Sequence, residues 1–177
     1  MKKIIALILS VAMCSSLVAC SEQMEINLPA SMFSGYTEEE IANEAQYYYC
    51  KSHTINEDGS VTYVLSENAY NNMLKSVRSE VDTTIANMLA EDSDVPAFKK
   101  ITYNDDLTEV FIYVDPELFE EYLVVYAITF YASGVYYQTY SGVAEEDIDI
   151  LVKFINVETN QGIKTGTYKE YLLATAT

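Results

Sequence analysis

Hydrophobic and polar positions alternate in three pairs of short segments along the chain, and a turn sequence separates the members of each pair. The turns are Asn56-Glu57-Asp58-Gly59, Asn104-Asp105-Asp106 and Asn160-Gln161-Gly162. Alternation with a period of two is typical of half-buried strands, and Gly or Asn in a short connection favours a hairpin. The pattern therefore predicts three antiparallel hairpins. Their strands are 50–55 with 60–66, 98–103 with 107–114, and 147–157 with 163–168.

The segment before the first hairpin predicts a lead-in and a short helix. Residues 26–33 form an apolar run that Pro29 interrupts. Because proline has no N–H to give to a sheet, we expect an edge strand or an extended lead-in there. Thr37 followed three residues later by Glu40 is a capping box, which is typical of a helix start. We therefore expect a short helix from about residue 38.

Two long helices are expected after the first two hairpins. Ser66 is a good N-cap, and the apolar positions that follow it have the period of a helix running to about Ala90. Asp115 and Pro116 form a favoured N-cap and first helical position for a helix running to about Tyr140. The stripe of the first of these helices consists of Tyr70, Met73, Leu74, Val77, Val81, Ile85, Met88 and Leu89.

The chain also contains a weak internal repeat. Residues 61–66 align with 110–115 at an offset of 49, and each unit reads as a hairpin, a capped start and a long helix. Residues 147–168 fit a third hairpin. The sequence therefore predicts an α+β fold in one domain. Its antiparallel sheet is built from repeated hairpin–helix (ββα) units, with two long helices packed on one face.

Strand alternation assigns residues to the two faces of this sheet. The face under the helices would carry Val61, Tyr63, Leu65, Val110, Ile112, Val114, Ile148, Ile150, Val152 and Phe154. The opposite face would carry Val64, Phe111, Tyr113, Leu151 and Ile155. These five are too apolar for a solvated face. Either the short first helix, a loop or the tail covers them, or they form an interaction surface.

Composition excludes several function classes. The chain has 10 Lys and Arg against 27 Asp and Glu, a formal net charge of −17, so we expect no nucleic-acid partner. A single histidine cannot build a two-His zinc or iron site within one chain. No phosphate loop, dinucleotide fingerprint or serine-hydrolase motif is present. We therefore expect no cofactor, no metal and no catalytic residue.

Three local features bear on chemistry. Cys50 and His53 lie three apart on a predicted strand and so point to opposite faces; we expect Cys50 buried against Leu65 and His53 exposed beside Thr62. Adjacent acidic residues are frequent, but their positions in caps and turns are typical of structural roles. Residues 122–144 carry no charge and six Tyr, a pattern that favours a buried central helix over a membrane span. The acidic groups also leave weak calcium binding open, at Asp92 with Asp94 and at residues 145–149.

The N-terminus resembles the signal peptide of a bacterial lipoprotein. Two lysines at positions 2 and 3 precede an uncharged apolar run, 4–13, and the string Leu17-Val18-Ala19-Cys20 is similar to the lipobox of that family. The resemblance implies that residues 1–19 are removed and that Cys20 carries a diacylglyceryl group. Residues 20–25 would be a short tether and 26–177 the extracytoplasmic domain. Cleavage removes two Lys and no acid, so the formal net charge becomes −19.

The mature part resembles small uncharacterised lipoproteins of Gram-positive bacteria, a likeness that supplies no activity and no site residues. We therefore expect a protein anchored in the cell membrane, on its extracytoplasmic side, through the lipid on Cys20. We expect it to act as a non-catalytic binding module whose partner is an envelope protein or a glycan. The alternatives are an envelope hydrolase that uses a carboxylate pair and a ligand-capture protein for a transporter or sensor.

Overall fold

The computed structural model of the chain describes residues 23–175. The predicted signal peptide and Cys20 lie outside these residues. The described strands are β1 (Gln23–Leu28), β2 (Ser52–Ile55), β3 (Val61–Ser66), β4 (Phe98–Tyr103), β5 (Glu109–Val114), β6 (Leu151–Asn156) and β7 (Gly162–Thr167). The α-helices are α1 (Glu38–Tyr47), α2 (Glu67–Met88), α3 (Ala127–Tyr140) and α4 (Tyr168–Thr175). Short 3-10 helices are η1 (Ala30–Phe33), η2 (Glu121–Tyr126) and η3 (Glu145–Asp147).

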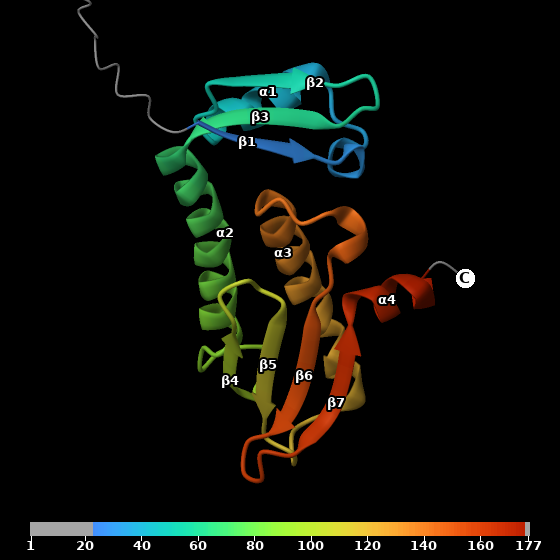
Figure 1. Cartoon of the computed structure of the whole chain (residues 1–177). Coiled ribbons are helices and arrows are strands. Elements are labelled where there is room, and N and C mark those ends of the chain that lie inside the picture. The colour runs from blue at the N-terminus through green and yellow to red at the C-terminus, as the bar shows by residue number, and fades with distance from the viewer. Residues whose placement is uncertain (1–22, 176–177) are drawn as a thin grey trace, which may run out of the picture.

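The strands form two sheets, so the expected α+β class is confirmed and the expected single antiparallel sheet is wrong. The N-terminal sheet has the order β1-β3-β2, and the C-terminal sheet has the order β4-β5-β6-β7. All neighbouring strands are antiparallel except β5 and β6, which are parallel. Figure 1 shows the two sheets at opposite ends of the molecule, with α2 running between them. The proposed hairpin–helix repeat is therefore not reproduced as one layered unit.

The two strands of the sequence repeat nevertheless have equivalent roles. Strand β3 is the middle strand of its sheet, and β5 is an inner strand of the other. Both alternate strictly between buried and half-buried residues. All of the residues predicted for the helix-covered face are buried: Val61, Tyr63, Leu65, Val110, Ile112, Val114, Ile148, Ile150, Val152 and Phe154. The repeat therefore reflects two central strands, each of which forms the core of its own sheet.

The first strand begins earlier than the sequence predicted. Strand β1 starts at Gln23, and its Glu25 lies opposite Val64 of β3, so residues 23–25 belong to the body and not to a tether. The strand lies at the edge of its sheet, as expected, and ends before Pro29. Proline cannot donate a ladder hydrogen bond, and here it leads into the 3-10 turn η1.

The first two helices begin as predicted. Thr37 and Glu40 form a complete capping box: the Glu40 amide donates to the Thr37 hydroxyl, and the Thr37 amide donates to the Glu40 carboxylate at 2.8 Å. At the start of α2, the Ala69 amide donates to the Ser66 hydroxyl. Helix α2 buries Ala69, Met73, Val77 and Val81. These local signals succeed because each cap satisfies backbone donors that would otherwise be unpaired.

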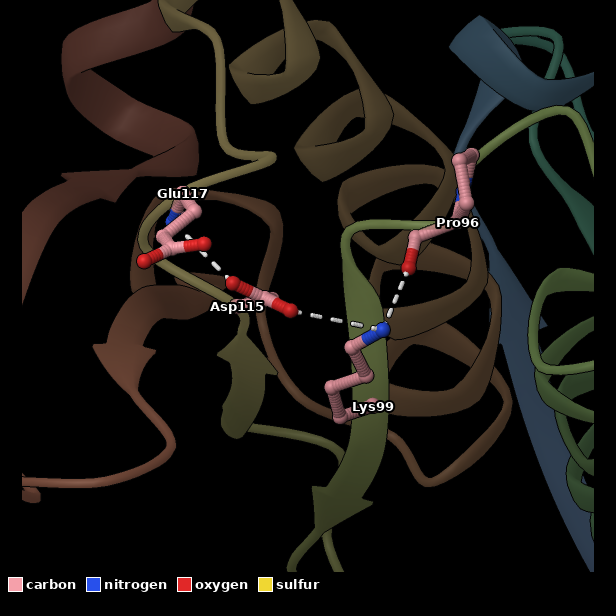
Figure 2. Close-up of polar contacts among 4 residues, drawn as sticks. All are labelled: Pro96, Lys99, Asp115 and Glu117. Atoms are coloured by element: carbon pink, nitrogen blue, oxygen red, sulfur yellow. Dashed lines mark hydrogen bonds and ion pairs between the residues drawn. The ribbon is translucent and has the colours of Figure 1, made fainter.

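The third helix begins about ten residues later than the sequence predicted. Figure 2 shows the turn that stands where the helix start was predicted: the Asp115 carboxylate accepts from the Glu117 amide at 3.0 Å, as an N-cap would, and it also faces Lys99 Nζ at 3.6 Å. Lys99 in turn donates to the Pro96 carbonyl. The turn ends because Glu120 is extended. The chain resumes as η2 and then α3.

Aromatic packing explains this single turn. Phe119, at its end, packs against Phe154 of β6 with the ring centroids 5.5 Å apart. A helix continuing directly from Asp115 would have to rebuild that contact, so tertiary packing decides where the helix starts.

Helix α3 packs closely against the C-terminal sheet and α2. Its Gly134 approaches Ile150 and the Leu107 carbonyl so closely that an added Cβ would lie 2.3 Å from Ile150 Cγ1. Arg78 of α2 donates to the Tyr137 hydroxyl at 2.6 Å and stacks on its ring. In Figure 1, α3 lies behind β5 and β6. No helix in the described part of the chain is long and apolar enough to cross a membrane.

Candidate functional site

The C-terminal sheet has one helix-covered face and one open face. Four apolar residues of β5 and β6 alternate with buried neighbours and are themselves half-buried. They are Phe111, Tyr113, Leu151 and Ile155. In Figure 1 the side of this sheet that faces the viewer has no helix in front of it. The parallel register places Tyr113 beside Ile155, so these side chains lie together on the exposed side. We call this set of four the open face.

Two lysines lie over the aromatic rings of the open face. Lys100 Nζ is 5.1 Å from the centroid of the Tyr113 ring, and Lys153 Nζ is 5.6 Å from the centroid of Phe111. Both distances fall in the range of cation–π contacts. The strand register also places Glu109 beside Leu151. The open face therefore combines an apolar centre with two lysines in a chain whose formal net charge is −17.

Val64, the fifth residue predicted for this surface, lies elsewhere. It belongs to β3, between Glu25 of β1 and Ser52 of β2, in the N-terminal sheet. The prediction placed it with Phe111 because the two strands of the repeat were expected to share one sheet. The open face is therefore smaller than predicted.

The Cys50 and His53 predictions need a correction in register. His53 lies opposite Tyr63 and is half-buried, whereas an exposed position beside Thr62 was expected. Cys50 precedes β2 and is half-buried against the core. Burial, with a smaller contribution from the Glu44 carboxylate, raises the pKa of its thiol to about 11. The thiol is therefore protonated at neutral pH and is a poor nucleophile.

A second candidate site lies between α1, α2 and α3, where the sequence predicted none. It is a pocket of about 470 Å³, which we call the tyrosine pocket. Its lining residues come from the η1–α1 connection and from all three helices. They are Tyr36, Glu44, Tyr47, Tyr48, Val77, Glu80, Ser133, Tyr136 and Tyr140. A neighbouring pocket of about 680 Å³ shares Tyr47 and Tyr48 and is lined by several side-chain amides.

Four of the five rings form a continuous series. The centroid of Tyr47 is 5.0 Å from that of Tyr48, Tyr48 is 5.6 Å from Tyr140, and Tyr136 is 6.2 Å from Tyr140. The series joins α1 to α3. Tyr140 is only 2% exposed, and its hydroxyl donates to Glu44 at 3.2 Å. The buried ring and its hydrogen bond fix the inner wall of the pocket.

Two carboxylates from different helices line the tyrosine pocket. Glu44 comes from α1 and Glu80 from α2. Burial raises the pKa of Glu44, and the hydrogen bond from Tyr140 opposes this only in part. Burial raises the pKa of Tyr140 as well. The acidic pairs that the sequence shows in caps and turns do not include these two residues.

We expect Glu44→Gln to alter how stability depends on pH. Because folding raises the pKa of Glu44, the folded state binds more protons than the unfolded state, and this group's contribution to stability falls as pH rises through the range between its unfolded and folded pKa values. Glutamine cannot ionise, so the variant does not lose this stability as pH rises. The free energy of unfolding of Glu44→Gln, measured in urea, should therefore improve relative to the unsubstituted chain over that range.

Glu40→Gln on the same helix is the matched control, with the opposite sign. Hydrogen bonds from Thr37 lower the pKa of Glu40, so its carboxylate stabilises the folded state above the unfolded pKa. Glu40→Gln should therefore lose stability relative to the unsubstituted chain as pH rises. Trends of the same sign in both variants would contradict the assigned environments.

Local sequence signals do not reveal the tyrosine pocket, because its residues come from segments as far apart as Tyr36 and Tyr140. The one available signal was the excess of tyrosine on residues 122–144 and at 47–49. The Tyr63 hydroxyl nearby is buried and has no hydrogen-bond partner among the described residues. Within residues 23–175, no three His, Cys, Asp or Glu side chains gather as a metal site would require.

Comparisons with known proteins add no family. No protein-family model matches the chain, and no curated protein or solved structure shows significant similarity to it.

Proposed function

We propose that this chain is a lipid-anchored, extracytoplasmic, non-catalytic binding protein that holds an envelope protein on its open face. The anchor is inferred from the lipobox-like string ending at Cys20. The observation that carries the binding role is the open face itself. It has an apolar centre of Phe111, Tyr113, Leu151 and Ile155 that no helix within residues 23–175 covers. Apolar side chains that gather on one partly exposed face support a partner site.

Charge indicates the chemistry of the partner. Lys100 and Lys153 are held over the rings, so a partner with carboxylates at the edge of an apolar patch would draw both ammonium groups outward and expose the aromatic faces. A neutral glycan would need those same ring faces but offers the lysines no charge in exchange. The open face therefore favours a protein partner over a glycan.

The test is capture from detergent-solubilised envelope of the native organism, with the full-length protein as bait. We expect the unsubstituted protein to retain a partner that the double variant Phe111→Ser/Tyr113→Ser loses, because buried aromatic anchors carry much of the binding energy of protein interfaces. Lys100→Glu/Lys153→Glu should weaken the same capture through charge reversal.

The matched control is Tyr122→Ser/Val125→Ser, which removes two exposed apolar side chains of η2, outside the open face. It should leave capture unchanged. Circular dichroism confirms that each variant is folded. Equal capture by the folded Phe111→Ser/Tyr113→Ser variant would exclude the open face as the binding surface.

An envelope hydrolase is the second candidate, and one observation favours it: Glu44 and Glu80 line a single pocket, and burial raises the pKa of Glu44. A raised carboxyl pKa is what a general acid requires. Hydrolysis of cell-wall glycan by the purified protein, abolished in Glu44→Gln and Glu80→Gln, would establish this function in place of binding alone.

A further inference from the structure

The tyrosine pocket holds negative charge without a matching positive side chain. None of the described residues that line it is Lys, Arg or His. Within residues 23–175, neither Glu44 nor Glu80 forms an ion pair with a basic side chain. Glu44 is half-buried, and its ionised form is disfavoured there. A cation in the pocket would offset that cost.

Five tyrosines line the pocket, so a cation inside it would lie close to several aromatic rings. Tyr47 and Tyr48 lie at the end of α1 and Tyr136 and Tyr140 on α3, and ring contacts join the four in a continuous series. The hydrogen bond between Tyr140 and Glu44 holds the innermost ring in place before any ligand enters. Aromatic faces are negative and attract cations, most strongly where water is excluded.

We propose that the tyrosine pocket binds a small organic cation with a quaternary ammonium head. Five of the nine lining residues are tyrosines, and aromatic rings are the groups that recognise quaternary ammonium ligands. A quaternary ammonium donates no hydrogen bond and is satisfied by ring faces and nearby carboxylates. The volume of about 470 Å³ lies within the range of small-ligand sites.

This site is separate from the open face. It is formed by α1, α2 and α3, whereas the open face belongs to β5 and β6. The inference therefore assigns a second binding activity to the protein. It stands or falls independently of the proposed envelope partner.

The test is titration calorimetry of the full-length protein in a non-ionic detergent, with choline as the probe. The control ligand is 3,3-dimethyl-1-butanol, which has the same shape as choline but no charge. We expect saturable choline binding and at least roughly tenfold weaker binding of the uncharged compound. Glycerophosphocholine distinguishes the source of the ligand: equal affinity indicates a lipid head group, and much weaker affinity indicates a free solute.

Variants locate the binding in the pocket. Tyr136→Leu and Tyr47→Leu remove partly exposed rings, so the fold should tolerate them, and each should weaken choline about fivefold. Glu80→Gln should weaken choline without affecting the uncharged compound. Tyr122→Leu is the matched control: Tyr122 is 64% exposed, close to the 67% of Tyr47, but it lies outside the pocket.

Three results would each overturn the proposal. The first is the absence of choline binding. The second is equal binding of choline and its uncharged isostere, which would mean that the site is merely apolar. The third is unchanged choline affinity in both Tyr136→Leu and Glu80→Gln.

Discussion

Gly134→Ala is expected to lower the free energy of unfolding by about 3 kcal/mol. The added methyl group would lie 2.3 Å from Ile150 Cγ1 and 2.9 Å from the Leu107 carbonyl oxygen. Ile150 is fully buried and the carbonyl belongs to the backbone, so neither can move aside cheaply. Alanine has the better helix propensity by about 1 kcal/mol, which offsets only part of this overpacking. Urea unfolding monitored by circular dichroism measures the difference.

Gly162→Ala is the matched control for this substitution. No atom lies within 4 Å of a Cβ built there, and the residue begins the edge strand β7. Its effect should stay within about 0.5 kcal/mol. If Gly134→Ala were as stable as Gly162→Ala, the close approach of α3 to the sheet would be incorrect.

Cys20→Ser is expected to abolish lipid attachment, because the thiol of Cys20 is the group that the lipobox resemblance marks for diacylglyceryl transfer. Two acyl chains give stable anchoring, whereas a domain with a formal net charge of −17 or below is repelled from an anionic membrane surface. Cells fed an alkyne fatty acid should label the unsubstituted chain. In the variant, labelling and recovery in the detergent phase should both fall at least about tenfold.

The two other cysteines of the chain provide control variants with the same Cys-to-Ser substitution. Cys14→Ser changes a residue within the predicted signal peptide, and Cys50→Ser changes the half-buried thiol next to α1. Both variants should keep full labelling. Labelling that persists in Cys20→Ser, or that disappears in Cys50→Ser, would show that Cys20 is not the lipidated residue. Either result would contradict the lipid anchor of the proposed function.

Local features of the fold followed from the sequence because their causes are local. The capping box at Thr37, the N-cap at Ser66 and the turns of the hairpins each depend on residues within about four positions of one another. The inner faces of β3 and β5 also followed, because alternation alone decides which side chains point to the core.

The arrangement of the sheets could not be predicted, because it depends on distant pairings. Val64 and Tyr113 have equivalent places in the repeat, and only the pairing of β1 with β3 and of β6 with β5 shows that they belong to different sheets. The start of α3 depends likewise on the contact between Phe119 and Phe154. The tyrosine pocket needs three helices in place before Glu44 and Glu80 share one space.

The parallel pair β5–β6 has a consequence for the order in which the chain folds. Glu109 pairs with Leu151, 42 positions later, whereas hairpins such as β2–β3 close over a few residues. Loop-closure entropy makes such distant pairing slow. Until β6 arrives, one edge of β5 presents unpaired backbone groups that other chains can recruit. We therefore expect refolding to slow and aggregation to rise when the segment between β5 and β6 is lengthened, even where equilibrium stability is unchanged.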